Sequence, residues 1–274
     1  MLTKEQYELC VGLLKKELVP ALGCTEPIAV AYAAACCREL LGCFPEHITV
    51  SSSGNIVKNV KGVIVPATGD MRGIDTSAIL GALAGDASLE MEVLGRVTPE
   101  DVEKVRALRN TGLCTLKVLD GIENLRIIVQ MEGGGHEALV EIAGGHTSIV
   151  RQELDGQVML SQAEKPGEGD AGYDGRQLSV ETIYAFAKTV DLADIRPILE
   201  RQVRLNMAIA EEGMADGYGA RVGRTVLEMG QSVADKAAAY AAAGSDARMG
   251  GCAMPVVINS GSGNQGITAS VPVV

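Results

Sequence analysis

Hydrophobic positions near the start of the chain recur at helical spacing. Apolar residues stand at positions i, i+3, i+4, i+7 and i+11, namely Tyr7, Cys10, Val11, Leu14 and Leu18. A period near 3.6 residues places them on one face of a helix, which Pro20 should close. A second helix is expected from Thr25 to Leu41, with Gly42 as its stop. It is apolar on nearly every side, which predicts burial.

The pattern then changes to short β-rich runs separated by turn residues. A turn is expected over residues 51–55, and Asp155-Gly156 indicates a hairpin. Thr98 and Pro99 mark the start of a helix that should end near Arg109. Strands are predicted at residues 48–50, 62–65, 113–119, 125–131, 138–142 and 147–154.

Helical spacing returns after a loop-like stretch at residues 164–175. Helices are expected at 180–190, 195–215 and 221–243. Together these patterns predict an α+β fold, in which an α+β module (residues 46–174) is inserted into a helical catalytic domain made from both ends of the chain (residues 1–45 and 175–274). Residues after Gly266 look β-like, as the start of an element, so the second helical part is expected to be truncated.

Composition narrows the possible partners. The 274 residues are 47% hydrophobic, and 24 basic against 35 acidic side chains give a net charge of −11. Only 3% are aromatic, so the chain lacks both the basic footprint and the stacking rings that nucleic acid binding requires. No run approaches the roughly 20 apolar residues of a membrane span, and the polar N-terminus has no apolar signal core. We therefore expect a cytoplasmic protein that binds neither nucleic acid nor membrane.

The most informative motif is Gly-Cys-x-x-Pro, which occurs twice, at Gly23–Pro27 and Gly251–Pro255. Cys24 lies just before a predicted helix N-terminus, where the helix dipole favours a thiolate that can bind a soft metal. A buried, purely structural cysteine is the alternative for both Cys24 and Cys252. The chain has seven cysteines, and the other five are expected to pack in the interior.

Three further segments offer weaker chemistry. Gly261–Gly266 formally matches a dinucleotide loop, but no helix is expected after it, so an anion-facing loop or an ordinary turn is the better interpretation. The Ser51–Asn59 segment carries hydroxyls, amides and one ammonium group that suit an amino acid's carboxylate and amine, although a solvated turn is equally consistent. His146 follows two glycines and is either a general base or a surface histidine.

These same segments resemble the L-cysteine desulfidase family, which is related to the iron–sulfur L-serine dehydratases. The resemblance covers essentially the whole chain and is carried by residues 21–27, 53–59, 65–69, 245–249, 252–255 and 259–266. It implies a lyase that converts L-cysteine to pyruvate, ammonia and hydrogen sulfide with a [4Fe-4S] cluster and without pyridoxal phosphate.

The resemblance also implies roles for individual residues. Three cysteines hold the cluster in that family, and Cys24 and Cys252 fall on two of them, whereas the third belongs to a downstream segment that this chain does not contain. The open iron would act as a Lewis acid on the leaving group while a base, Lys58 or His146, removes the α-proton. Arg248 could pair with the substrate carboxylate or form a local salt bridge. The full set of substrate-binding candidates is Ser53, Asn55, Asn59, Thr68, Arg248, Asn259, Ser260 and Asn264.

Three alternatives remain open at this point. An L-serine dehydratase would use the same mechanism, a truncated remnant would bind an amino acid without catalysis, and a pyridoxal-dependent lyase is a weaker option. The Ala- and Gly-rich helices favour close subunit packing, so a homodimer is expected.

Overall fold

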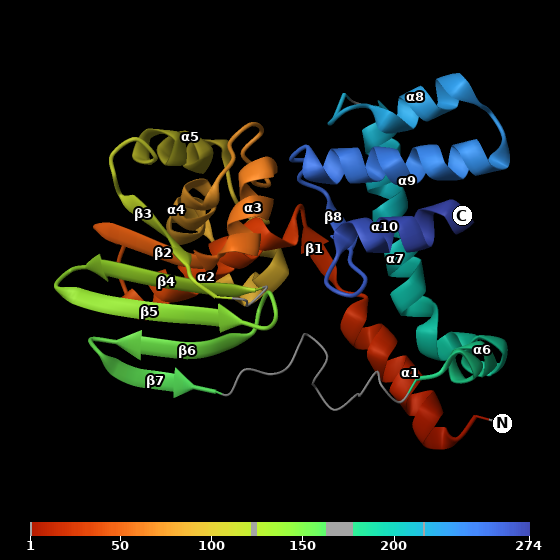
Figure 1. Cartoon of the computed structure of the whole chain (residues 1–274), viewed down its shortest axis with the longest axis horizontal. Coiled ribbons are helices and arrows are strands. Elements are labelled where there is room, and N and C mark those ends of the chain that lie inside the picture. The colour runs from red at the N-terminus through yellow and green to blue at the C-terminus, as the bar shows by residue number, and fades with distance from the viewer. Residues whose placement is uncertain (1, 122–124, 163–177, 216) are drawn as a thin grey trace. The chain divides into compact units, whose positions relative to one another are not determined.

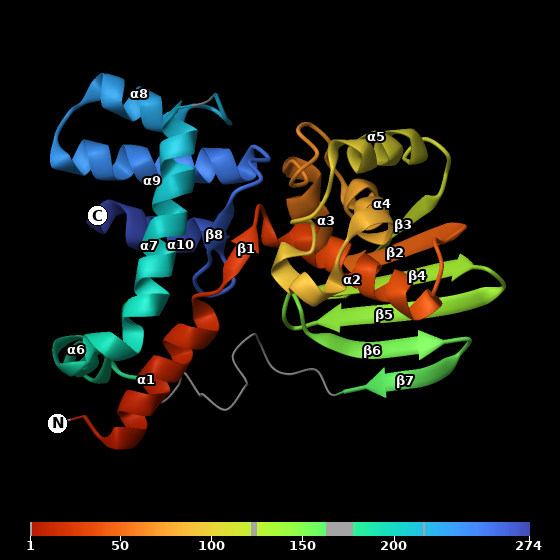
Figure 2. The same cartoon turned by 180° about the vertical axis from the view of Figure 1, so that it is seen from behind.

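A computed structural model describes residues 2–121, 125–162, 178–215 and 217–274. It is an α+β fold, as the sequence predicts, and Figures 1 and 2 show it from opposite sides. The chain divides into two compact units. The helical unit comprises residues 1–21, 166–247 and 255–274, and the α+β unit comprises residues 22–165 and 248–254.

A six-stranded sheet organises the α+β unit, in the order β3-β2-β4-β5-β6-β7. Strands β2 and β3 run parallel, and every other neighbouring pair is antiparallel. The bounds are β2 (His47–Ser53), β3 (Cys114–Leu119), β4 (Arg126–Gly133), β5 (His136–Ala143), β6 (Ile149–Leu154) and β7 (Gln157–Ser161).

Helix α2 (Thr25–Leu41) packs on β4 and β5, in front of the sheet in Figure 2. The Cys37 thiol lies 3.5 Å from the Val129 carbonyl oxygen and 3.4 Å from that of Ala138. Helix α4 (Ile74–Ala84) lies against α2 so closely that a Cβ on Gly81 would be 2.2 Å from the Ala31 carbonyl oxygen. This close approach explains why small residues fill α2, which is buried on nearly all sides as predicted.

The remaining elements of the α+β unit are α3 (Gly54–Gly62), the 3₁₀ helix η1 (Ala87–Glu92) and α5 (Pro99–Leu108). Helix α5 begins at the predicted residue, where the Thr98 hydroxyl and the Asp101 carboxylate form a reciprocal capping box. Residues 22–45 pack within this unit, whereas the sequence prediction placed them in the helical domain. The predicted domain boundaries stay a prediction.

The helical unit contains α1 (Lys4–Glu17), α6 (Val180–Thr189), α7 (Leu192–Ala215), α8 (Val222–Met229), α9 (Val233–Met249), α10 (Gly263–Ser270) and the short η3 (Val271–Val273). Strands β1 (Pro20–Leu22) and β8 (Pro255–Val257) form a two-stranded sheet. The buried Asn206 amide of α7 donates to the Val257 carbonyl at 3.1 Å and accepts from the Val257 N–H at 2.8 Å. Both backbone groups of that β8 residue are thereby satisfied.

The turn predicted over residues 51–55 is wrong, because β2 extends to Ser53 and α3 begins at Gly54. Ile56 and Val60 are four residues apart and both buried, so tertiary packing favours a helix over the local turn preference. The strand predicted at 62–65 is also absent; Ile64 forms only an isolated bridge with Arg72.

Residues 263–270 form helix α10, which corrects the expectation that no helix follows the Gly-rich loop. The Ser262 hydroxyl caps the helix by accepting from the Gln265 N–H. Gly266 permits close packing on β8, since a Cβ there would be 2.0 Å from the Val257 carbonyl oxygen.

The helix predicted at 221–243 is two helices, α8 and α9. The Ser232 hydroxyl accepts from the Asp235 N–H, and the Asp235 carboxylate accepts from the Ser232 N–H, so a local cap starts a new helix there. None of the helices in the described parts of the chain combines the length and the apolar character needed to cross a membrane.

Candidate functional site

The glycines of the two Gly-Cys-x-x-Pro segments pack against the same short stretch of the α+β unit. Gly23 and Gly251 have φ values of +55° and +91°, which favour glycine. A Cβ on Gly23 would lie 2.2 Å from Pro66 Cγ, and one on Gly251 would lie 2.5 Å from Ile64 Cγ2. Residues 64 and 66 therefore hold the segments that carry Cys24 and Cys252.

Cys24 occupies the N-cap position of α2, and its side chain is buried. Its thiol donates to Oε2 of Glu26 at 2.9 Å, and the Thr25 hydroxyl donates to the same oxygen at 3.1 Å. The other carboxylate oxygen, Oε1, accepts from Nδ2 of Asn59 on α3 at 2.8 Å. Glu26 thus joins the start of α2 to the middle of α3.

The environment of Glu26 favours its charged form. Burial by itself would raise the pKa of Glu26, but the hydrogen bonds from Cys24 and Asn59, together with the nearby His146, outweigh it and lower the pKa below its usual value. Glu26 is an anion in this arrangement, held by three donors.

Burial raises the pKa of the Cys24 thiol to about 12, and the charge of Glu26 adds to this effect. The guanidinium of Arg248 acts in the opposite direction but does not offset them. The expectation that the helix dipole makes Cys24 a thiolate is therefore wrong for the protein without a metal, because loss of water costs a buried anion more than the dipole returns. A bound metal ion would have to displace this proton.

Arg248 lies in the last turn of α9 and is only 3% exposed. Burial lowers the pKa of its guanidinium, while the charges of Cys24 and Glu26 raise it. These electrostatic interactions place Arg248 near both side chains. A buried cation thus lies within electrostatic range of the Cys24 thiol and the Glu26 carboxylate.

Helix α3 carries three of the predicted site residues. Asn55 and Asn59 lie one turn apart, and Lys58 lies between them in sequence. Asn55 and Lys58 are exposed, whereas Asn59 is half-buried and bonded to Glu26. Half-buried His146 belongs to the same group through its effect on Glu26.

Two other predicted residues have structural partners. The Ser53 hydroxyl accepts from the Arg126 N–H at 3.3 Å. The Thr68 hydroxyl donates to the Val65 carbonyl at 2.6 Å and accepts from the Met71 N–H at 3.2 Å. Thr68 thus closes the loop that follows residues 64–66, and these bonds explain its burial without a ligand.

The last three predicted residues belong to the helical unit. The Ser260 hydroxyl donates to the Asn259 side-chain oxygen at 3.0 Å, and Asn264 lies in the first turn of α10. Their part in a common site with Cys24 stays a prediction.

Sequence reasoning missed the central residue of this cluster, Glu26. It is part of the first Gly-Cys-x-x-Pro segment, and an acid in the first turn of a helix is ordinarily explained by the helix dipole. Its bond to Asn59 joins residues 33 positions apart, which no local pattern indicates.

The described residues contain no group of three or more His, Cys, Asp or Glu side chains that could hold a metal ion. Cys24 and Cys252 are buried thiols of the type that binds iron, so the donor type fits an iron–sulfur cluster. The set is incomplete within the part of the chain that the structure describes.

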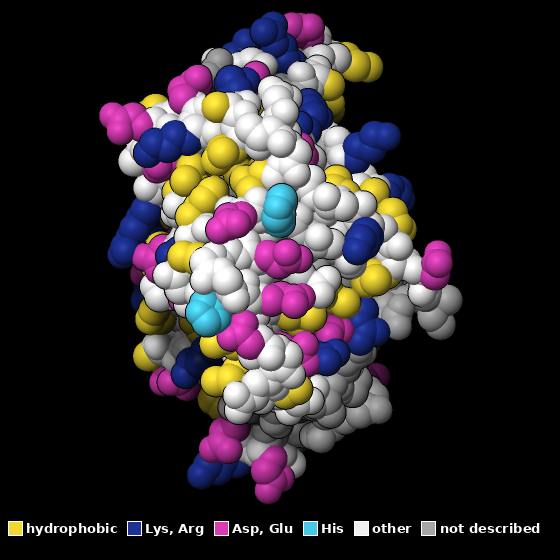
Figure 3. All heavy atoms as spheres, turned by 90° about the vertical axis from the view of Figure 1, so that its left-hand side faces the viewer, with side chains coloured by type: hydrophobic (Ala, Val, Ile, Leu, Met, Phe, Trp, Pro, Cys, Tyr) yellow, Lys and Arg dark blue, Asp and Glu magenta, His cyan; other side chains and the backbone are white. Residues whose placement is uncertain are grey.

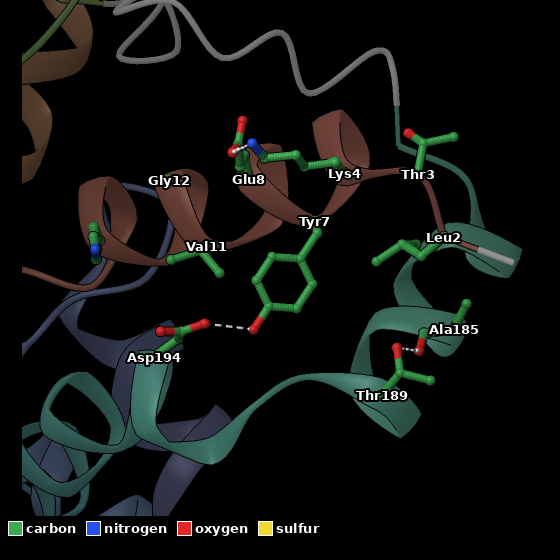
Figure 4. Close-up of a pocket in the computed structure, with 11 residues that line it drawn as sticks. Leu2, Thr3, Lys4, Tyr7, Glu8, Val11, Gly12, Ala185, Thr189 and Asp194 are labelled. Carbon is green, nitrogen blue, oxygen red and sulfur yellow. Dashed lines mark hydrogen bonds and ion pairs between the residues drawn. The ribbon is translucent and has the colours of Figure 1, made fainter.

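A depression of about 880 Å³ lies in the helical unit, between α1, α6 and α7. In Figure 4 the Tyr7 hydroxyl points to Asp194 and donates to its carboxylate at 2.6 Å. No residue predicted for the site lines this depression. We therefore place the candidate site around Glu26.

Figure 3 shows one face of the molecule, on which acidic side chains lie among basic ones, with histidines between them. Mixed charge of this kind does not attract a polyanion. The expectation of a small-molecule partner stays a prediction.

The chain is similar to a known protein family and to several bacterial proteins. The family described as the serine dehydratase alpha chain matches residues 88–274. A UPF0597 protein of Lachnoclostridium phytofermentans is 49% identical over 269 residues, which are 98% of this chain and 64% of that protein. UPF0597 proteins of Finegoldia magna and Treponema denticola are 44% and 42% identical, over 96% and 100% of this chain and 63% and 65% of their own lengths. This chain therefore spans slightly less than two thirds of these relatives, and no solved structure matches it.

Proposed function

This chain belongs to the serine dehydratase alpha chain family, and on that premise we propose that it acts in a lyase that performs β-elimination on a small L-amino acid. L-cysteine is the substrate we favour, and L-serine is the second candidate because the family description names serine. The observation that carries the proposal is the cluster in which Glu26 binds Cys24 and Asn59 beside the buried Arg248.

The cluster offers groups that complement an amino acid. The Arg248 guanidinium is suited to the substrate carboxylate, because a buried arginine gains from a bidentate anion. The amides of Asn55 and Asn59 and the hydroxyl groups of Ser53 and Thr68 are proposed to orient the rest of the molecule. Asn259, Ser260 and Asn264, of the helical unit, stay proposed substrate-binding residues.

The reaction breaks two bonds on the substrate. A base, Lys58 or His146, takes the α-proton, and the electron pair left on Cα forms a double bond to Cβ as the C–S bond breaks. The sulfur leaves with its bonding pair and takes a proton to form hydrogen sulfide. The remaining enamine becomes an imine, and water hydrolyses it to pyruvate and ammonia. With L-serine the leaving group is water.

We propose Cys24 and Cys252 as two thiolate ligands of a [4Fe-4S] cluster, with a third ligand from outside the described residues. When bound, such a cluster supplies Lewis acidity towards the leaving group. Thiol ligands buried at 6% and 5% exposure would keep water away from it.

The experiment is anaerobic purification and reconstitution, followed by iron and sulfide analysis and by pyruvate assays with L-cysteine and L-serine. We expect brown protein and pyruvate from one or both substrates. The Cys24→Ala variant should lose both, whereas Cys10→Ala, in the helical unit, should keep the iron. Colourless protein that forms no pyruvate after reconstitution would refute the proposal for this chain.

A second candidate is an amino-acid-binding protein without catalysis. It is favoured by the buried Arg248 guanidinium and the amides of Asn55 and Asn59, which suit an amino acid whether or not a reaction follows. It predicts thermal stabilisation by L-cysteine or L-serine in metal-free protein. The absence of a shift in melting temperature with either amino acid would refute it.

We also propose that the protein is a cytoplasmic homodimer. Light scattering at several protein concentrations would test the dimer.

A further inference from the structure

A second, smaller hollow lies entirely within the helical unit. It has a volume of about 320 Å³ and is bounded by α1, α6, α7 and α10. Most of its wall is apolar, with Leu14, Phe186 and Leu199 among the contributors. Its size is at the lower end of the range for small-molecule sites.

Gln202 lines this hollow from α7 and is only 6% exposed. Its side-chain amide forms no hydrogen bond with any residue that the structure describes. Buried amides in proteins are almost always paired, with protein, water or a ligand. The Gln202 amide is not among the fully enclosed, unpaired side-chain groups of the described residues, so it is reached from the hollow, where water or a ligand can pair with it.

Asn206, one turn further along α7, provides the comparison. It is also buried, and its amide is paired with both backbone groups of Val257 and with the Ser270 hydroxyl. The buried amide of Asn206 is thus fully hydrogen-bonded at a place where α7 packs only against other parts of the protein. Gln202 differs because it borders the hollow.

Charge limits the kind of molecule that fits. Among the described residues of the wall, Glu17 is the only Asp, Glu, Lys, Arg or His, and a carboxylate beside it would be repelled while losing its water. Asn259 adds a second amide at the wall. The surroundings thus favour an uncharged molecule that can hydrogen-bond to an amide.

We propose that this hollow binds a small uncharged molecule with an apolar body and one hydroxyl group, which pairs with the Gln202 amide. The hollow is lined by residues of the helical unit, whereas Glu26 belongs to the α+β unit. The hollow shares Asn259 with the residues proposed for the substrate site, but the proposal does not depend on the proposed lyase activity. Its ligand differs in chemistry from a zwitterionic amino acid.

Three probes of similar size test the proposal: benzyl alcohol, toluene and phenylacetate, with binding measured by ligand-detected NMR titration. Benzyl alcohol should bind about fivefold more tightly than toluene, because toluene leaves Gln202 unpaired. Phenylacetate should bind at least about tenfold more weakly than benzyl alcohol, because its charge must be buried beside Glu17. Equal binding of benzyl alcohol and toluene, or no binding of either, would overturn the proposal.

Two variants assign the selectivity to its residues. Gln202→Leu should remove the preference for benzyl alcohol over toluene, and Glu17→Gln should reduce the discrimination against phenylacetate. Arg204→Gln, at an exposed position of α7, is the control and should change neither ratio.

A measurement on the protein without substitutions tests the proposal even if the variants do not fold. Cys10 lines the hollow, and Cys43 lies in the α+β unit. Benzyl alcohol should slow the alkylation of Cys10 by N-ethylmaleimide and leave Cys43 unchanged, as followed by peptide mass spectrometry. Equal rates at Cys10 with and without the probe would contradict occupation of the hollow.

Discussion

The thiol of Cys24 donates a hydrogen bond of 2.9 Å to the carboxylate of Glu26, two residues further along the first turn of α2. The same carboxylate accepts from Asn59 of α3. Glu26 therefore stabilises the contact between two helices as well as the orientation of the thiol.

Removing this acceptor should destabilise the protein. Glu26→Ala leaves the donors of Cys24, Thr25 and Asn59 without their partner, and we expect a loss of about 1–3 kcal/mol. Glu26→Gln keeps one oxygen acceptor and should lose less. Urea denaturation followed by circular dichroism measures both. Glu8→Ala, on the exposed surface of α1, should stay within about 0.5 kcal/mol of the parent, and an equal effect of Glu8→Ala and Glu26→Ala would contradict the role of the hydrogen bonds.

The contribution of Glu26 should depend on pH. Its pKa in the folded protein is lower than its ordinary value of 4.5, so the folded state binds the proton less tightly than the unfolded state. The stabilisation is therefore fully present above the ordinary carboxyl pKa and is lost as the pH falls through the lower folded pKa. The stability difference between the parent and Glu26→Gln should be constant from about pH 6 to 8 and shrink below about pH 4.5. A difference that grows in acid would show the opposite sign.

Cys24 should react slowly with thiol reagents in the metal-free protein. Its pKa of about 12 leaves little thiolate near neutral pH, and its side chain is 6% exposed. At pH 8 we expect iodoacetamide to label it more than about tenfold more slowly than the partly exposed Cys43, because only the thiolate attacks. Peptide mass spectrometry over a time course gives both rates, and labelling of Cys24 as fast as Cys43 would show that the thiol is not buried as described.

Because Gly251 lies close to Ile64, a side chain at position 251 should destabilise the protein, and a smaller residue at position 64 should restore part of the stability. Gly251→Ala combines an unfavourable positive φ with a Cβ placed 2.5 Å from Ile64 Cγ2, and should lower stability by about 2 kcal/mol or more. Gly42→Ala, with φ of +81° but open space around it, should lose only about 1 kcal/mol. Ile64→Ala should recover part of the loss in the double variant with Gly251→Ala. Strict additivity of the two substitutions in thermal unfolding would argue against the contact.

If the proposed function holds, Arg248 should affect substrate binding most. Arg248→Lys keeps the charge but loses the planar, bidentate fork, so KM for the substrate should rise about tenfold with a smaller change in kcat. Initial-rate measurements on the anaerobically reconstituted protein separate the two constants. An unchanged KM would remove Arg248 from the carboxylate site.

Local sequence signals were sufficient for several elements. The apolar stripe that predicts the first helix corresponds to α1, and Thr98 begins α5 through its capping box. Both depend on residues within one or two turns of each other. The Asp155-Gly156 hairpin was predictable for the same reason, since two turn residues determine it.

Other features depended on distant parts of the chain. Helix α3 forms where turn residues predominate because Ile56 and Val60 are buried by other elements. The parallel pairing of β2 with β3 joins residues more than 60 positions apart. The bond between Glu26 and Asn59 likewise requires α2 and α3 to be placed first. Sequence patterns pointed to the cysteines as the candidate site but could not find the acid that holds one of them.

Ile64 and Pro66 are separated by a single residue, yet each fills the space that a side chain would need at one of the two cysteine-bearing turns. The stretch therefore sets the spacing between those turns. Gain or loss of one residue between positions 64 and 66 would move one turn relative to the other by about 3.5 Å. An exposed loop such as residues 110–112, between α5 and β3, tolerates a change in length far better. We expect related sequences to vary in length at the loop and to keep a constant length at 64–66.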